Sequence, residues 1–144
     1  MPDTPRHSVS VAGIVVSNAD QVLIVQRRDN GHWEPPGGVL ELNEQFEEGV
    51  RREVYEETGM NVRVERLTGV YKNLTAGVVA LAFRCTPLGD PDPATAEAVA
   101  VRWAELAEIS DLMDPAYAVR VTDAFGDFAV TRAHDGIHLV VTGY

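Results

Sequence analysis

Four successive apolar residues, Val22 to Val25, constrain the fold of this chain more than any other feature. In a strand, successive side chains point to opposite faces, so Val22 and Ile24 would face one side and Leu23 and Val25 the other. A strand that is apolar on both faces belongs in a sheet that is covered on both faces. We therefore expect a sheet that lies between other layers of structure.

Further segments rich in valine and isoleucine predict the other strands of this sheet. The predicted strands are Ser8 to Val16, Gln21 to Arg28, Asn61 to Val70, Val78 to Phe83 and Ala98 to Trp103. The polar turn Ser17 to Asp20 separates the first two, which predicts that they are adjacent strands. Leu88 to Thr95 is rich in proline, glycine and aspartate and is expected to be a surface loop.

One helix is clearly expected between the second and third predicted strands. Asn43 is a good N-cap, Glu44 would occupy the first turn, and Gly59 is placed to end the helix. The expected buried stripe consists of Phe46, Val50 and Val54. A second helix should begin with Asp114 as cap and Pro115 at its first position, and end near Gly126. Strands interleaved with two helices indicate an α/β or α+β fold.

The C-terminal stretch predicts an additional hairpin over residues 128–142. Phe128 to Arg132 and Ile137 to Thr142 flank Asp135-Gly136, a strong turn signal. Such a hairpin would add an exposed edge, at which a homodimer could form.

The size and charge of the chain limit what it can bind. With 144 residues, 45% of them hydrophobic, residues 1–144 are expected to form one domain, with Met1 to His7 as a flexible tail. A formal net charge of −10 has the wrong sign for binding polymeric nucleic acid. A small anionic substrate is compatible with this charge if a cation bridges it to the protein.

Two further features of the sequence concern the cellular compartment of the protein. Cys85 is the only cysteine, so no intrachain disulfide can form, and it is expected to fill the core. The sequence has no apolar run of membrane-spanning length. A cytoplasmic protein without a membrane partner is the expectation.

The segment from Gly38 to Met60 contains glycines, glutamates and an arginine at characteristic spacings. Five residues separate Gly38 from Glu44, seven separate Glu44 from Arg52, and the segment ends in Arg-Glu-Val-Tyr-Glu-Glu-Thr-Gly-Met. This segment resembles the Nudix box at every defined position, and Trp33 to Gly38 resembles the usual approach to it. The resemblance implies a Nudix-type α/β/α sandwich with a mixed β-sheet between helices, and a hydrolase that depends on Mg²⁺, with Mn²⁺ as a second candidate.

The glutamates of this segment have a physical reading of their own. Glu53, Glu56 and Glu57 are spaced i, i+3, i+4, so on a helix they share one face with Cβ atoms roughly 5–6 Å apart. Like charges at this distance repel unless a cation lies between them, and Mg²⁺ binds carboxylates together with phosphate oxygens and water. A merely solvated acidic face is the alternative, and the complete spaced pattern disfavours it.

The resemblance assigns roles to individual residues. It implies that Glu53, Glu56 and Glu57 bind metal together with the backbone of Gly38. It implies that Arg52 orients the catalytic glutamates Glu53 and Glu56, and that Glu53 is slightly favoured as the general base. Two further carboxylates are implied, Glu44 as a supporting group and Glu97 as an external catalytic or metal-linked group.

Substrate contacts are expected from the strand and loop that precede the predicted helix. Arg27 or Arg28 could donate to a diphosphate, and Gly37 and Gly38 allow the backbone to approach the phosphate closely. Trp33 and Tyr71 could stack on a base but fit core or rim packing better, and His32 is expected to be solvated.

These features favour a hydrolase that cleaves a diphosphate linkage in a small nucleotide-like molecule. The first alternative is a Nudix-like domain that binds a nucleotide as a sensor without hydrolysis, and the second is an acidic interaction module that does not respond to metal. The proline or tyrosine that marks some subfamilies downstream of the box is absent, because Thr75 to Val78 occupy that region. A nucleoside triphosphate or a broad range of substrates is therefore preferred.

Overall fold

A computed structural model describes residues 3–92, 94 and 96–141 of the chain. Its strands are β1 (Ser8–Val15), β2 (Val22–Gln26), β3 (Trp33–Glu34), β4 (Gly37–Val39), β5 (Val62–Asn73), β6 (Val78–Pro87), β7 (Ala100–Ala104), β8 (Val130–His134) and β9 (Leu139–Val140). Its helices are α1 (Phe46–Thr58), α2 (Ile109–Leu112) and α3 (Pro115–Asp123), with a 3₁₀ turn at Leu106–Glu108.

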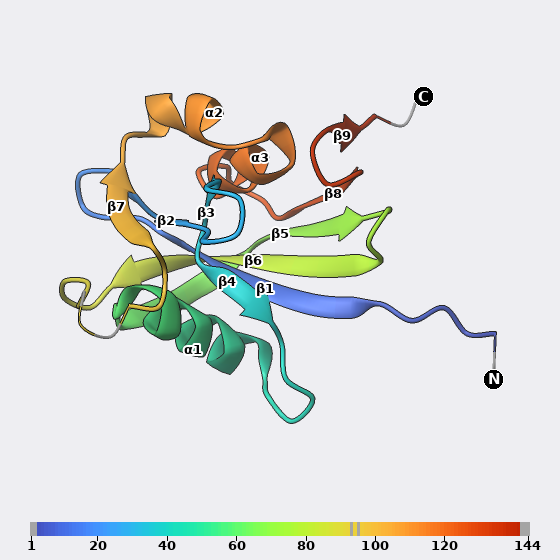
Figure 1. Ribbon diagram of the computed structural model, residues 1–144, viewed down its shortest axis with the longest axis horizontal. Coiled ribbons are helices and arrows are strands. Elements are labelled where there is room, and N and C mark those ends of the chain that lie inside the picture. The colour runs from blue at the N-terminus through green and yellow to red at the C-terminus, as the bar shows by residue number, and fades with distance from the viewer. Residues whose placement is uncertain (1–2, 93, 95, 142–144) are drawn as a thin grey trace.

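Two sheets form the framework among these residues. The larger has the order β4-β1-β6-β5-β8-β9, in which β1 pairs parallel with β6 and β5 parallel with β8. The smaller is antiparallel, with the order β3-β2-β7. Figure 1 shows α1 on one side of the larger sheet and α2 and α3 on the other. The predicted α/β/α sandwich with a mixed sheet between helices is confirmed.

The prediction that the first two strands are adjacent is wrong. Strand β1 pairs with β4 and β6 in the larger sheet, whereas β2 belongs to the smaller sheet. A single bridge between Val16 and Val22 joins the two strands. The turn between them is closed by the Ser17 hydroxyl, which accepts from the backbone of Ala19 and Gln21. Strand β2 instead pairs with β3 and β7, so segments that follow it in the sequence decide its sheet.

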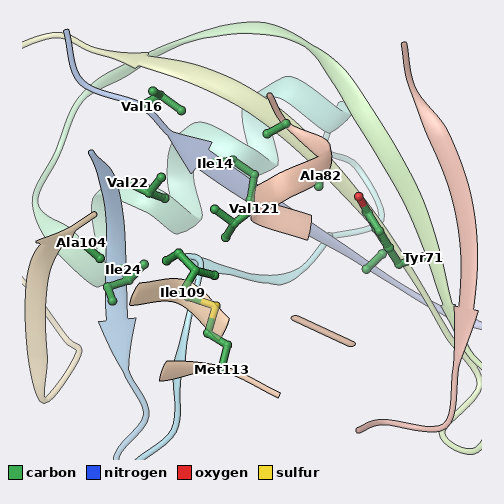
Figure 2. Packing of buried hydrophobic residues seen from close by; sticks show 12 residues of the cluster. Ile14, Val16, Val22, Ile24, Tyr71, Ala82, Ala104, Ile109, Met113 and Val121 are labelled. Atoms are coloured by element: carbon green, nitrogen blue, oxygen red, sulfur yellow. The ribbon is translucent and has the colours of Figure 1, made fainter. Parts of the chain in front are cut away.

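The core lies on both sides of the larger sheet, and β1 and β2 contribute to each side. Ile14, Val22 and Ile24 pack with Val121 of α3, as Figure 2 shows. Val11, Val15 and Leu23 pack with Val50 and Val54 of α1 in the second cluster. All four residues from Val22 to Val25 are at most 1% exposed, which confirms that both faces of β2 are covered.

Helix α1 starts two residues later than predicted. Its N-cap is Gln45, and Asn43 lies in a preceding turn in which the Glu44 backbone N–H donates to the Glu41 carbonyl at 3.2 Å. The Glu44 carboxylate accepts from the backbone N–H of Glu41 at 3.1 Å, so Glu44 stabilises this turn and does not enter the helix. The predicted end is confirmed, because Gly59 adopts the left-handed conformation with φ of 71°.

The predicted buried stripe of α1 is correct except at its first position. Val50 and Val54 are fully buried, but Phe46 is 45% exposed. The stripe begins instead at Gly49, where an added Cβ would lie 2.6 Å from the Leu40 side chain. The first turn of the helix therefore packs through backbone close to Leu40, and this packing leaves Phe46 outside the core.

The C-terminal half contains both expected and unexpected elements. Helix α3 has Asp114 as N-cap and Pro115 at its start, as predicted. Helix α2, the 3₁₀ turn and strands β3 and β4 were not predicted, because elements of two to four residues are too short to show a hydrophobic period. Cys85 is buried with a free thiol, as expected.

The C-terminal hairpin is confirmed over its described residues. Strands β8 and β9 pair antiparallel around Asp135-Gly136, and β9 is the outer strand of the larger sheet. The turn spans four residues and not two, because the Asp135 carboxylate accepts from the backbone N–H groups of Ile137 and His138. Thr142 lies outside the described residues, and the role of this edge in a dimer stays a prediction.

Three further expectations concern the tail, the loop and the membrane. Asp3 to His7 form no helix or strand, and Met1 and Pro2 lie outside the described residues. The described part of Leu88 to Thr95 is irregular, as expected for a loop, and Pro93 and Thr95 lie outside it. Within the described ranges, no helix is long and apolar enough to cross a membrane.

Close packing of α1 on β1 depends on Gly13, where an added Cβ would lie 2.7 Å from the Val54 side chain. We expect Gly13→Ala to lower the free energy of unfolding by about 1–3 kcal/mol, because overpacking forces neighbours to shift. In a Val54→Ala background the same change should cost less, since the opposing methyl group is gone. Urea unfolding of the four proteins in this cycle measures the coupling, and an equal cost of Gly13→Ala in both backgrounds would contradict this packing.

Candidate active site

Two of the predicted glutamates, Glu53 and Glu57, project from α1 toward the loop that leads into and through β4. The backbone N–H of Gly37 donates to Glu57 Oε1 at 3.2 Å. An added Cβ on Gly38 would lie 2.5 Å from Glu53 Oε2, so only glycine lets this carboxylate lie against the loop. The predicted loop and helix are therefore in contact, as the spacing of the box requires.

The second glycine of the pair is needed on the opposite side of the loop. An added Cβ on Gly37 would lie 2.4 Å from the backbone oxygen of Val11 in β1. Gly37 pairs with Ala12 and Gly38 with Val11 in the β1–β4 ladder. The short strand β4 thus fixes the loop to the larger sheet on one side and to the helix carboxylates on the other.

Arg52 joins three carboxylates and the loop around one guanidinium. Its Nε and Nη2 donate to the two oxygens of Glu44 at 2.6 and 2.9 Å. Its Nη1 donates to Glu53 at 2.8 Å and to Glu56 at 3.3 Å, and its Nη2 also donates to the Val39 carbonyl at 3.1 Å. Bidentate charge-assisted hydrogen bonds of this kind are directional, so Arg52 fixes the orientation of these side chains.

The segment around Glu97 docks on the C-terminal end of α1. The backbone N–H of Glu97 donates to the Glu56 carbonyl at 3.0 Å, and that of Ala98 donates to the Glu57 carbonyl at 3.4 Å. These carbonyls belong to the last turn of the helix, which has no internal partners for them. The docking brings Glu97 to the same cleft as the box glutamates.

A cleft of about 350 Å³ contains most of the predicted site residues. The predicted residues that line it are Arg27, Arg28, Gly37, Glu53, Glu57 and Glu97. Asp29, Glu34, parts of β2 and the segment after Glu97 complete the walls. Glu44, Glu56 and Gly38 are not among the lining residues. Arg52 connects Glu44 and Glu56 to Glu53, and Gly38 lies against Glu53.

Burial and hydrogen bonds from Arg52 shift the pKa values of the glutamates in and beside the cleft. Burial raises the pKa of Glu57 to about 8, although the Gly37 N–H opposes the shift, and nearby Glu53 and Glu34 add to it. Burial also raises the pKa of Glu53, against the effect of Arg52. The hydrogen bonds from Arg52 lower the pKa of Glu44 to about 2. Arg52 therefore compensates the charge of Glu53 and Glu44, whereas Glu57 forms no ion pair with a residue that the structure describes.

The donor set of the cleft suits a hard divalent ion. Within the described residues, no three acidic, histidine or cysteine side chains converge on one point as the side chains lie. The reason is that Glu53 and Glu56 are turned toward Arg52, and Glu57 toward the Gly37 N–H. The three carboxylates occupy neighbouring positions i, i+3 and i+4 on one helix face, the arrangement that a shared cation requires.

The two arginines at the end of β2 differ in their partners. Arg27 donates to Asp29 at 2.8 and 2.9 Å and forms an ion pair with Glu34 at 3.3 Å. Arg28 forms no ion pair with any residue that the structure describes, and it lines the cleft. Arg28 is thus the more available donor for an incoming anion.

The remaining sequence candidates lie outside the cleft. Tyr71 is fully buried and its hydroxyl donates to Asp123 at 2.8 Å, which confirms core packing. Trp33 is half-buried against the core beside Arg102, as expected for rim packing. His32 is exposed and lies 3.7 Å from a carboxylate oxygen of Asp114.

Two residues that sequence reasoning missed lie in a second cavity beside the cleft. Arg120 of α3 and His134 of β8 both line this cavity of about 320 Å³. They are separated along the chain and meet only in the folded protein, so no local motif could have indicated them. Glu34 lines both spaces and was also missed.

Comparison with known proteins indicates the same family as the Nudix box does. The model of the NUDIX domain matches residues 6–125. A MutT-like protein from Streptomyces ambofaciens is 53% identical over 140 residues, covering 96% of this chain and 91% of that protein. A putative 8-oxo-dGTP diphosphatase from Bacillus subtilis (strain 168) is 41% identical over 59 residues, covering 41% of this chain and 40% of that protein.

Solved structures support the fold. The crystal structure of a NUDIX hydrolase from Nitrosomonas europaea superposes with a TM-score of 0.72 at 22% identity, covering 90% of this chain and 81% of that one. At this identity the likeness speaks for the fold alone. Together with the match over residues 6–125 and the extended identity to the Streptomyces protein, it shows that this chain belongs to the Nudix family and is a Nudix pyrophosphohydrolase.

Proposed function

We propose that this protein uses Mg²⁺, or Mn²⁺ in its place, to cleave a diphosphate linkage in a nucleoside diphosphate joined to another moiety, with a nucleoside triphosphate as the preferred example. The observation that carries the proposal is the placement of Glu53 and Glu57 against the Gly37-Gly38 loop in one cleft. A buried carboxylate without a paired cation, such as Glu57, is costly, and a divalent ion that also binds phosphate oxygens removes that cost.

The residues that would hold the ion are Glu53, Glu56 and Glu57 together with the backbone of Gly38. Bound Mg²⁺ would neutralise charge on the diphosphate oxygens and lower the pKa of the attacking water. Gly38 lacks a Cβ where the Glu53 carboxylate approaches, so this carboxylate and the backbone of the loop lie against each other. This closeness supports the assignment of both to one metal ion.

The chain's own residues have separable tasks in the proposed reaction. Arg52 holds Glu53 and Glu56 by ion pairs and thereby positions them. Glu53 is the favoured group to remove a proton from water, because burial raises its pKa toward the range in which a general base works. Glu97, on the docked loop across the cleft, is the external candidate for the same task.

Substrate binding is assigned to the arginine side of the cleft. Arg28 is available to an anion, and Arg27 stands between the cleft and the second cavity. A guanidinium binds phosphate oxygens through two parallel N–H groups, which favours a diphosphate over a single charge. The name of the Bacillus relative, an 8-oxo-dGTP diphosphatase, supports a nucleotide as the substrate.

The alternative of a nucleotide sensor without hydrolysis has less support. A sensor would not need the complete set of box carboxylates, and this chain has Glu44, Glu53, Glu56 and Glu57. The −10 net charge supports a small substrate over a nucleic acid polymer, and a lone cysteine is compatible with the proposed cytoplasmic location.

Two isosteric changes on α1 test the proposed activity. We expect Glu57→Gln to lower kcat on the order of a hundredfold or more at saturating Mg²⁺, because the group proposed to bind the ion loses its charge. Glu47→Gln removes the same charge from an exposed position of the helix and should keep near-native kcat. Rates are measured on a panel of nucleoside diphosphate derivatives with product analysis, and equal near-native rates for both variants would refute the site.

The raised pKa of Glu57 predicts a pH dependence of stability in the metal-free protein. The pKa is about 8 in the folded protein against 4.5 for an ordinary glutamate, so the folded state binds more protons between these values. The associated stability is fully present below pH 4.5 and is lost as the pH rises through about 8. Glu57→Gln should remove this loss.

The measurement is urea unfolding in EDTA between about pH 5 and about pH 8. In this interval, proton linkage requires the free energy of unfolding of the wild type to fall as the pH rises. The stability of Glu57→Gln relative to the wild type should increase across this interval. Glu47→Gln serves as the control and should follow the wild-type slope. A constant difference between Glu57→Gln and the wild type would show that Glu57 is ionised in the metal-free cleft.

A further inference from the structure

The two walls of the catalytic cleft belong to different parts of the fold. Glu53 and Glu57 project from α1, which packs on β1 of the larger sheet. Arg27 and Arg28 follow the last residue of β2, which belongs to the smaller sheet. A ligand that bridges the two walls, as a metal-bound diphosphate would, therefore depends on how far apart they are held.

Core packing fixes the first half of β2 relative to the helix. Leu23 belongs to the same buried cluster as Val50 and Val54 of α1. Arg27 comes four residues after Leu23, which is roughly 13 Å along an extended strand. The position of the arginine end of β2 therefore depends on further contacts.

The backbone of Glu97 and Ala98 provides a contact at that end. Its two successive N–H groups donate to the carbonyls of Glu56 and Glu57, at 3.0 and 3.4 Å. Two hydrogen bonds at neighbouring residues fix the direction of the segment as well as its position, because each bond is directional. The segment is therefore held in register with the last turn of α1, where the proposed metal ligands Glu56 and Glu57 lie.

Very little chain separates this docked pair from β2. Val99 alone lies between Ala98 and Ala100, the first residue of β7. Ala100 pairs with Gln26, the last residue of β2, and Arg27 follows directly. Two peptide units span at most roughly 7 Å, so this connection cannot absorb a large displacement of the helix relative to the strand.

The same segment forms part of the cleft itself. Glu97, Ala98 and Val99 line the cleft together with residues of both walls. Burial raises the pKa of Glu57, and the charge of Arg27 opposes this rise, so the two walls lie within electrostatic reach of each other. The segment thus lies where it can control their spacing.

From these contacts we infer that the Glu97–Ala98 backbone is a spacer that sets the distance between the carboxylate wall and the arginine wall, and that Ala98 is a positioning residue of the reaction. Ala98 has only a methyl side chain, so it acts through its N–H group. A misplacement of about 1 Å between reacting groups can cost on the order of a hundredfold in rate. This inference rests on the proposed function, because it takes the metal to be bound at α1 and the diphosphate to bridge both walls.

Exchange of the Ala98 amide for an ester tests the spacer. Replacement of Ala98 by lactic acid removes the N–H group and leaves the methyl side chain in place. The probe is methylenediphosphonate, a diphosphate analogue that is not hydrolysed, titrated calorimetrically at saturating Mn²⁺. We expect its affinity to fall roughly tenfold, because the walls are no longer held at the spacing that suits one ligand. Affinity for Mn²⁺ alone should stay within about twofold, since its proposed ligands lie on α1 and β4 and not on the arginine wall.

Kinetics give a second readout of the same variant. The ester at Ala98 should lower kcat/KM for hydrolysed nucleotides on the order of 10- to 100-fold at saturating Mn²⁺. The matched control is Ala19, whose N–H donates to Ser17 Oγ at 3.2 Å in the turn at the other end of β2. The same exchange at Ala19 should leave kcat/KM and both affinities unchanged.

A glycine inserted after Ala98 tests the spacing independently. The insertion keeps both N–H donors of the docked pair and lengthens the connection to β7. Affinity for methylenediphosphonate should again fall while Mn²⁺ binding persists. If the ester protein does not fold, this variant decides the matter.

The outcomes separate the inference from the proposed function. Absence of saturable Mn²⁺ binding by the wild type, or of nucleotide hydrolysis, would overturn the proposed function and the inference with it. Normal Mn²⁺ binding with unchanged diphosphonate affinity in the variants would overturn the inference alone. An equal loss of Mn²⁺ and diphosphonate affinity would also overturn it, because the segment would then shape the metal ligands and not the spacing of the walls.

Discussion

The hydrogen bonds that Arg52 forms to Glu44, Glu53 and Glu56 are the interaction on which the rest of the site depends. Carboxylates on successive turns of one helix repel each other, and a guanidinium among them offsets that repulsion while fixing their directions. Because Arg52 also donates to the Val39 carbonyl, the same group ties the helix to the end of β4. The hydrogen bonds of Arg52 therefore both compensate the charges of the carboxylates and hold the end of β4 against the helix. This arrangement explains why an arginine serves here and a lysine would not, since an ammonium lacks the planar fork.

Close backbone packing makes that interaction geometrically possible. Gly13 lets α1 approach β1, and Gly37 and Gly38 let the β4 loop pass between the sheet and the Glu53 carboxylate. A methyl group at any of these positions would collide with backbone or with a packed side chain. The glutamates consequently lie in a partly buried cleft, and burial raises the pKa of Glu57 and Glu53. The proposed need for a cation follows from this burial, so the fold and the proposed chemistry have a common physical cause.

The sequence predicted those parts of the structure that depend on local spacing. The shared face of Glu53, Glu56 and Glu57 follows from helical periodicity, and the end of α1 at Gly59 follows from the left-handed conformation that glycine adopts. The start of α1 was misjudged because Glu44 bonds to Arg52, eight residues later, and to the Glu41 backbone. Asn43 has good intrinsic capping chemistry, but this longer-range pairing places it in the preceding turn.

Features that depend on distant contacts could not be read from the sequence. The separation of β1 and β2 into different sheets depends on the pairing of β2 with the distant strand β7, which local turn signals do not encode. Arg120 and His134 have ordinary surroundings in the sequence, and their contact arises only where α3 and β8 meet. Glu97 was placed by resemblance, and its docking on the last carbonyls of α1 gives that placement a physical basis.

Binding of Mn²⁺, followed by electron paramagnetic resonance of the free ion, tests the central claim that Arg52 organises the α1 carboxylates into a metal site. The comparison uses the wild type, Arg52→Lys and, as a matched control, Arg51→Lys at the exposed neighbouring position. The wild type and Arg51→Lys should bind Mn²⁺ saturably with similar affinity. Arg52→Lys should bind it about 10- to 100-fold more weakly, as is typical when a residue that orients metal ligands is lost. Equal affinity in Arg52→Lys and the wild type, or no saturable binding by the wild type, would contradict the account.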